Sequence, residues 1–97
     1  MRALKTSDIG TSSKIMKKLD IELTGESEIQ VGINLVKGIM ENYHKAEEEV
    51  AELMSNLIGI TKDEWLNLNI EETVKYFEEL KNQPGIAGFF QLLGKIG

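Results

Sequence analysis

Residues 28–58 read EIQVGINLVKGIMENYHKAEEEVAELMSNLI and carry the strongest pattern in this chain of 97 residues. Apolar side chains recur there at alternating spacings of four and three, interrupted only at Glu47: Ile29, Ile33, Val36, Met40, Tyr43, Val50, Met54 and Leu57. A heptad spacing of this kind is typical of one face of a long α-helix. The sequence therefore predicts one long helix over approximately residues 28–58.

Further apolar residues widen this stripe beyond a two-stranded coiled-coil seam: Leu35, Ile39, Ala46, Ala51 and Leu53. A wide stripe is typical of a helix that packs against several others in a bundle. A coiled coil between copies of the chain, and hence a homo-oligomer, is the alternative. Gly32 and Gly38 lower the helix propensity, by up to about 1 kcal/mol each relative to alanine, so they either allow close approach of another segment or mark a bend.

Shorter helices are predicted on both sides of this segment. Thr6 or Ser7 can cap a first helix that runs to about Leu19. Residues 20–27 break the pattern and read as a connection, with a short extended piece at residues 21–23. Gly59 stands where a left-handed helix C-cap is expected.

Two capping signals follow Gly59. Thr61 and Glu64 match a capping box, which predicts a short helix carrying Trp65 and Leu66. The stretch from Asn69 to Glu72 resembles a second capping box. It predicts the start of a helix with four inward-facing residues: Ile70, Val74, Phe77 and Leu80.

The last predicted helix follows a proline stop. Pro84 and Gly85 end the preceding helix, because proline supplies no N–H and disfavours a helical residue before it. Residues 86–93 then place apolar side chains at helical spacing. The fold class predicted is all-α: a small bundle of about five helices around one long central helix. Residues 1–97 form a single domain, with a flexible basic N-terminus and an apolar C-terminal helix.

Composition and charge narrow the class of protein. The chain has no cysteine, which excludes disulfides and sulfur-ligated zinc. Its net charge of −5 is uneven: residues 1–18 carry five basic residues and one acidic residue, whereas the rest carry six basic and fifteen acidic residues. No apolar run reaches the ~18 residues of a membrane span, and the acidic body disfavours nucleic acid. We expect a cytoplasmic protein that binds neither a membrane nor nucleic acid.

Motifs for catalysis or cofactor binding are weak. His44 and Glu48 lie one helical turn apart, but no second cluster completes a metal site. The glycines never fall in a phosphate-loop spacing, and a single histidine is poor support for a catalytic triad. We therefore expect no enzymatic activity, no metal and no cofactor.

The C-terminal helix offers candidate contact residues for a partner. Phe89 and Leu93 are expected to close the core, whereas Phe90 is expected to point away from their face. Apolar residues beyond what the core needs are typical of a protein-binding site. The predicted partner-binding residues are Phe90, Leu92 and Ile96.

Three phrases of the sequence carry a resemblance to a known family. They are LKTSDIGTSSKIMKKLDI at residues 4–21, ENYHKAEEEVAELMSNLIGITKDEW at residues 41–65 and VKYFEELKNQPGIAGFFQLLGK at residues 74–95. The chain resembles the tail assembly chaperones of long-tailed phages and prophages of Gram-positive bacteria. The likeness covers most of the chain and is weakest around residues 20–32.

The resemblance implies a non-enzymatic role. Such chaperones bind and solubilise the tape measure protein and help recruit tail tube protein, in the host cytoplasm, and they are absent from the mature virion. It also implies a longer product made by ribosomal frameshifting. Leu93-Gly94-Lys95 can be encoded by a slippery heptamer that would serve this purpose; alternatively, Gly94 caps the last helix.

A second hypothesis is a small helical regulator or antitoxin-like protein. It would bind a partner or nucleic acid through its basic N-terminal helix, where Lys14, Lys17 and Lys18 lie close together. The alternative that these lysines are a solvated face complementing the acidic body is also open.

Overall fold

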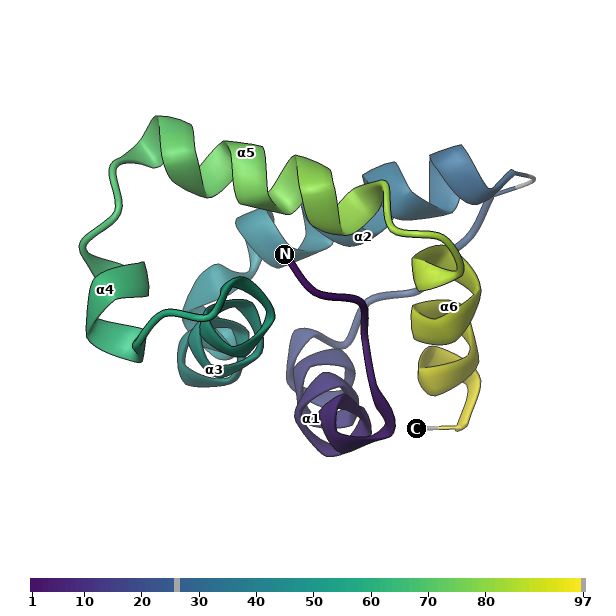
Figure 1. The fold of residues 1–97 in the computed structure, drawn as a ribbon. Coiled ribbons are helices and arrows are strands. Elements are labelled where there is room, and N and C mark those ends of the chain that lie inside the picture. Colours follow the sequence, from purple (N-terminus) through teal and green to yellow (C-terminus); the bar gives the residue numbers. More distant parts are fainter. Residues whose placement is uncertain (26, 97) are drawn as a thin grey trace.

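The computed structural model describes residues 1–25 and 27–96, except for the side chain of Ile96. The described residues contain helices and no strands, which confirms the all-α prediction. The elements are η1 (Thr6–Asp8), α1 (Ile9–Leu19), α2 (Glu28–Glu41), η2 (Tyr43–Lys45), α3 (Glu47–Ile58), α4 (Lys62–Leu66), α5 (Ile70–Lys81) and α6 (Ile86–Ile96), where η marks a 3₁₀-helix (Figure 1).

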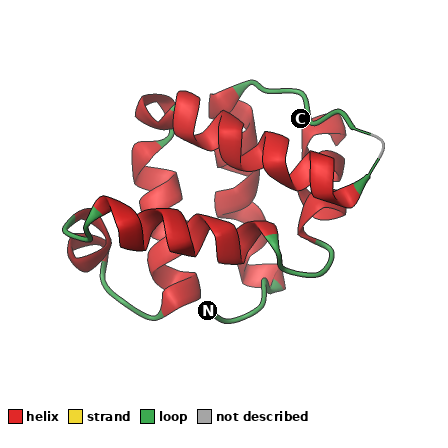
Figure 2. Cartoon of the chain, turned by 90° about the horizontal axis from the view of Figure 1, so that it is seen from above, coloured by secondary structure: helices red, strands yellow, loops and turns green. Residues whose placement is uncertain are grey.

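The helices form two layers. α2 and α5 lie side by side in one layer, as the view from above shows (Figure 2). α1, α3 and α6 form the layer beneath, with α1 packed against both of its neighbours. α4 follows α3 and lies beside it at one end of the molecule (Figure 1).

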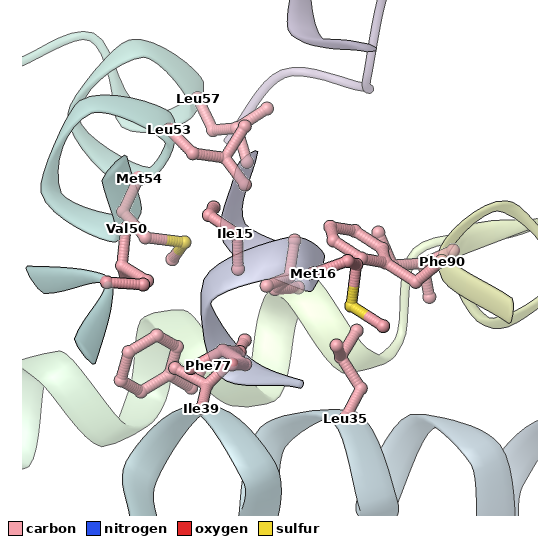
Figure 3. Close-up of a cluster of buried hydrophobic side chains, with 14 of the residues drawn as sticks. Ile15, Met16, Leu35, Ile39, Val50, Leu53, Met54, Leu57, Phe77 and Phe90 are labelled. Carbon is pink, nitrogen blue, oxygen red and sulfur yellow. The ribbon is translucent and has the colours of Figure 1, made fainter. Parts of the chain in front are cut away.

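The core lies between the two layers. Ile15 and Met16 of α1 occupy its middle, between α3 side chains on one side and Phe90 of α6 on the other (Figure 3). Leu35 and Ile39 of α2 close it from the other layer. Burying side chains of this size stabilises the fold by about 1.5–3 kcal/mol each. Because α1 packs against both α3 and α6 and its side chains occupy the middle of the core, α1 is the central helix.

The prediction of one long helix over residues 28–58 is wrong. The chain leaves the helical conformation between α2 and α3, where Asn42 and Ala46 have non-helical backbone angles and η2 intervenes. A straight helix over those residues would be about 46 Å long at 1.5 Å per residue. That exceeds the longest dimension of the molecule, 34 Å. Folding back instead brings α3 against α1, where Val50 and Leu57 are buried.

The heptad seam also faces differently in α2 than predicted. Val31, Leu35 and Ile39 are buried there, at spacings of four residues. Ile29 and Met40 of the predicted seam are instead 74% and 50% exposed. The α3 part of the seam is buried in the core, whereas Val36 and Tyr43 are only partly buried against it.

Gly32 and Gly38 allow close approach and do not bend α2. A Cβ atom on Gly32 would lie 3.0 Å from Cγ of Lys81 in α5, and one on Gly38 would lie 2.4 Å from Cδ1 of Ile21. The break in the helix comes after both glycines. Residues 21–23, where a short extended piece was predicted, contain neither helix nor strand.

The N-terminal residues pack along the body of the protein. The backbone N–H of Arg2 donates to the carbonyl of Leu57 at 2.8 Å, and the Gln83 side chain donates to the carbonyl of Arg2 at 2.9 Å. Gln83 Oε1 in turn accepts from the N–H of Leu4 at 3.4 Å. The segment thereby joins the end of α3 to the turn between α5 and α6.

Candidate partner-binding groove

An apolar groove lies where the end of α2, η2, α4 and the start of α5 meet. It has a volume of about 340 Å³, near the lower end of ligand pockets, which span roughly 300–1,000 Å³. We call it the α4–α5 groove. Its lining residues are Met40, Tyr43, Glu47, Trp65, Leu66, Leu68, Ile70, Thr73, Val74 and Phe77.

Aromatic side chains form the floor of the groove. Trp65 is buried and meets Phe77 edge-on, with ring centroids 5.7 Å apart and an interplanar angle of 77°. Its indole N–H donates to the Tyr43 hydroxyl oxygen at 3.1 Å. The Trp65 N–H thus has its hydrogen-bond partner inside the protein, and this bond fixes the indole as part of a rigid floor.

The rim of the groove is apolar and exposed. Met40 of α2, Leu66 of α4 and both Ile70 and Val74 of α5 are large hydrophobic residues open to solvent. The prediction that Ile70 and Val74 face inward is therefore wrong, while Phe77 and Leu80 are buried as predicted. α5 turns its Phe77/Leu80 side to the core and leaves the Ile70/Val74 side uncovered.

Two helix caps hold the rim residues in place. The Thr61 hydroxyl accepts from the N–H of Glu64, and the Glu64 carboxylate accepts from the N–H of Thr61, both at 3.1 Å, which confirms the predicted capping box. Asn69 Oδ1 accepts from the N–H of Glu72 at 2.9 Å and starts α5. The Asn69 side-chain amide, and not its backbone N–H, meets the Glu72 carboxylate. These caps set where Leu66 and Ile70 fall.

The segments that form the groove carry a net negative charge. Glu47 is the only carboxylate or amine among the lining residues, and among the described residues it has no ion-pair partner. Residues 40–47 and 62–77, which contain all the lining residues, carry six acidic residues and three lysines, a net charge of −3. One of these lysines, Lys62, shares an adjoining hollow with Glu47 and Leu66. The groove thus combines apolar walls with segments rich in carboxylates, which we call its acidic border.

The three partner-binding residues predicted on α6 have different outcomes. Phe90 is fully buried, so the prediction that it points away from the core is wrong. It fills the space beside Met16 (Figure 3), whereas Phe89 and Leu93 are only half-buried. Leu92 is 55% exposed and its role stays a prediction. The side chain of Ile96 lies outside the described part of the structure.

Leu92 is not part of the groove, because α6 and α4 lie at opposite ends of the molecule (Figure 1). Gly94 lies inside α6, so the alternative that it caps this helix is wrong.

The basic N-terminal helix is partly neutralised by α3. Lys18 of α1 forms an ion pair and hydrogen bond with Glu49. The Lys18 ammonium lowers the pKa of the Glu49 carboxyl, mainly through this hydrogen bond. Lys14 and Lys17 are exposed. The pairing favours the interpretation of these lysines as a surface that complements the acidic body.

The groove has the shape and chemistry of a binding surface for apolar side chains.

Nowhere in the described residues do three or more His, Cys, Asp or Glu side chains gather closely enough to hold a metal ion. Among the described helices, none combines the length and apolarity that crossing a bilayer requires. His44, considered above with Glu48, is exposed.

The sequence carries a signal for the rim, in the form of a second apolar stripe on α5 and on α2. α5 carries two overlapping apolar stripes, one through Ile70, Val74 and Phe77 and one through Phe77 and Leu80. α2 likewise carries a stripe through Ile29, Ile33 and Met40 beside the buried one. A helix at the surface of a small bundle buries one stripe, so a second stripe indicates apolar side chains that stay exposed, of which Met40, Ile70 and Val74 line the groove.

No protein-family model, no curated protein sequence and no solved structure matches this chain.

Proposed function

We propose that the protein is a non-enzymatic assembly chaperone of the phage tail type, which binds a tape measure protein through the α4–α5 groove. The observation that carries the proposal is the exposed rim formed by Met40, Leu66, Ile70 and Val74. Apolar patches of this kind mark protein-binding sites, because a stable domain gains nothing by leaving large side chains in water. The resemblance of three phrases of the sequence to tail assembly chaperones suggests the identity of the partner.

The chemistry of the groove suits this role. A chaperone of this class must cover apolar side chains of a long helical protein until assembly, without changing them covalently. Trp65 and Phe77 are buried beneath the rim and support it rigidly, so the contact area for a partner comes from the exposed side chains of Met40, Leu66, Ile70 and Val74. Recruitment of tail tube protein, a frameshifted longer product, a place in the host cytoplasm and absence from the mature virion complete the proposal.

Co-expression with the tape measure protein that a neighbouring, very long gene should encode tests the proposal. Wild-type protein should co-purify with it and keep it soluble, whereas Leu66→Asp should lose most of the co-purified partner while its circular dichroism and melting temperature stay near those of wild type. An aspartate on the exposed rim leaves the core intact but costs a bound complex several kcal/mol, because it would be buried unpaired.

Leu92→Asp is the matched control, since Leu92 and Leu66 are equally exposed, at 55% each. Loss of the partner with Leu92→Asp and not with Leu66→Asp would move the site to α6. No co-purification by the wild type would reject the tail-chaperone proposal. The order of genes gives a further check: the gene should lie between the tail tube gene and a very long helical gene.

The regulator hypothesis predicts a different result. Binding of DNA or RNA with a steep salt dependence, lost when Lys14 and Lys17 are replaced by alanine, would support it against the chaperone.

A further inference from the structure

The charges around the α4–α5 groove define the segment that fits it. Glu47 is the first residue of α3 and stands in the lining beside apolar side chains. The segments that form the groove, residues 40–47 and 62–77, carry the net charge of −3 noted above. An uneven distribution of this kind attracts a partner of opposite charge and repels one of like charge.

We infer that the α4–α5 groove binds an amphipathic α-helix whose apolar stripe is flanked by lysine or arginine, one of which pairs with Glu47. This inference rests on the proposed function, because it describes the segment of the partner that the chaperone holds. The apolar stripe covers the rim residues Met40, Leu66 and Val74. The flanking cations face the acidic border.

The groove favours a helix over an extended segment. An extended segment needs hydrogen-bonding partners for its backbone, as a sheet edge provides. The described elements around the groove are all helices and offer no such edge. A helix satisfies its own backbone groups and presents apolar side chains at i, i+3, i+4 and i+7 to a groove.

Charge excludes the other occupants of an apolar groove. A second copy of the chain would bring two acidic borders together, and an anionic lipid surface or a nucleic acid would meet the same repulsion. The α1 helix of a second copy does not supply a basic helix for the groove, because its apolar residues Ile15, Met16 and Leu19 are buried in its own core, although Lys14 and Lys17 are exposed. The observations therefore favour a basic helical segment.

Binding of three synthetic peptides to the full chain tests the inference. All three are labelled with a fluorophore and carry the same apolar residues. The first has a helical apolar stripe flanked by lysines, the second has the same stripe flanked by glutamates, and the third keeps the lysines but scrambles the stripe. Fluorescence anisotropy should show the first peptide binding at least about tenfold more tightly than the other two, because only it matches both shape and charge.

Variants of the protein locate the interaction. Glu47→Gln should weaken the first peptide about two- to fivefold, as expected for a partly exposed ion pair, and should reduce its salt dependence. Glu52→Gln is the control, since Glu52 lies on the same helix outside the groove and is exposed. Leu66→Asp should abolish binding of the first peptide.

Several outcomes would overturn the inference. Equal binding of the scrambled peptide would show surface attraction alone, and equal binding of the acidic peptide would remove the charge argument. A dimer in sedimentation that Leu66→Asp dissociates would show that a second copy fills the groove. These results are distinct from failure of the proposed function: a tape measure protein that binds through Leu66 while the basic peptide does not would reject only this inference. A peptide that binds as expected while the tape measure protein does not would reject only the proposed function.

Discussion

Phe90 and Leu92 lie two residues apart in α6 and have opposite environments. Phe90 is 0% exposed and Leu92 is 55% exposed. Phe90→Ala should lower the free energy of unfolding by about 3–5 kcal/mol, the usual cost of removing a buried phenylalanine. Leu92→Ala should change it by less than about 0.5 kcal/mol. Urea unfolding followed by circular dichroism measures both, and a Phe90→Ala variant as stable as wild type would contradict the assignment of Phe90 to the core.

Ser12 is a buried residue whose replacement should stabilise the protein. Its side chain is 0% exposed, and among the described residues its hydroxyl has no hydrogen-bond partner. Ser12→Ala removes this unpaired group and improves helix propensity, so it should raise the free energy of unfolding by about 1–2 kcal/mol. Ser13→Ala is the control, because Ser13 is exposed in the same helix and only its propensity changes. A destabilised Ser12→Ala variant would mean that the hydroxyl has a partner.

The buried carboxylate of Asp8 makes the free energy of unfolding depend on pH in the acidic range. Its carboxylate is buried, accepts from both guanidinium nitrogens of Arg2 at 2.7 and 2.9 Å, and accepts from the N–H of Lys5 at 2.8 Å. The Arg2 hydrogen bonds are the main cause that lowers the pKa of Asp8. A carboxyl whose pKa is lower in the folded than in the unfolded chain stabilises the fold above the unfolded pKa, about 3.9. That stabilisation is lost as the pH falls through the folded pKa.

Asp8→Asn should therefore cost about 1.5–3 kcal/mol at pH 7, the range for hydrogen bonds to charged groups. The difference between wild type and Asp8→Asn should shrink as the pH is lowered below about 4. Denaturant unfolding from pH 7 down to pH 2.5 measures this. A difference that stays constant over that range would show that the ion pair contributes nothing.

At the scale of the elements, α2 shows what its sequence pattern leaves undetermined. Its apolar residues form two adjacent stripes, one through Val31 and Ile39 and one through Ile29 and Met40. Either stripe satisfies a helical period, and the second also continues into a heptad. The choice is made by α5 and α6, which lie far away in the sequence and pack against α2.

The two stripes of α2 predict opposite effects for neighbouring residues. Ile39 is buried and Met40 is half-exposed. Ile39→Asp should abolish cooperative unfolding, because an unpaired buried charge costs as much as the whole stability of a small domain. Met40→Asp should fold with a melting temperature within a few degrees of wild type but should lose partner binding at the groove. Thermal unfolding followed by circular dichroism separates the two variants, and equal loss of structure in both would restore Met40 to the core.

Helix boundaries were easier to predict than helix faces. The capping box at Thr61 and the cap at Asn69 act within one helical turn, so the starts of α4 and α5 follow from adjacent residues. The break between α2 and α3 has a weaker signal. The Asn42 side-chain amide donates to the carbonyl of Gly38 at the end of α2 at 3.2 Å, but neither Asn42 nor Ala46 caps the start of the next helix with its side chain. It arises because a longer helix would leave most of its length uncovered in so small a protein.

At the scale of the whole molecule, the groove was beyond local prediction because it joins residues from α2, α4 and α5. The sequence indicated an excess of apolar residues but placed it on α6, at Phe90. Packing reverses that assignment, because Phe90 fills the core beside Met16 while Ile70 and Val74 remain outside. Which apolar residues are surplus depends on how much surface the other layer covers.

The last prediction concerns Gln83, which connects the N-terminal segment to the two layers. Its side chain donates to the carbonyl of Arg2 and accepts from the N–H of Leu4, while Arg2 also bonds Leu57 at the end of α3. Gln83→Ala removes both side-chain bonds and should cost about 1–2 kcal/mol. For a domain of this size that corresponds to a melting temperature lower by roughly 4–10 °C.

Gln30→Ala is the control for this change. Gln30 is exposed in α2, and its side-chain amide donates only to Asn34 among the described residues. Amide hydrogen exchange adds a local measurement, because the N–H of Leu4 should lose its protection in Gln83→Ala and keep it in Gln30→Ala. If Leu4 stays protected and the melting temperature is unchanged, the other contacts of the segment hold it: the bonds of Arg2 to Leu57 and Asp8, and the ion pair of the N-terminal amine with Glu79. If Gln83→Ala instead loses the protection of the Leu4 N–H and melts at a lower temperature, the Gln83 side chain holds residues 1–4 across the end of α3. This one side chain in the α5–α6 turn then couples the two layers.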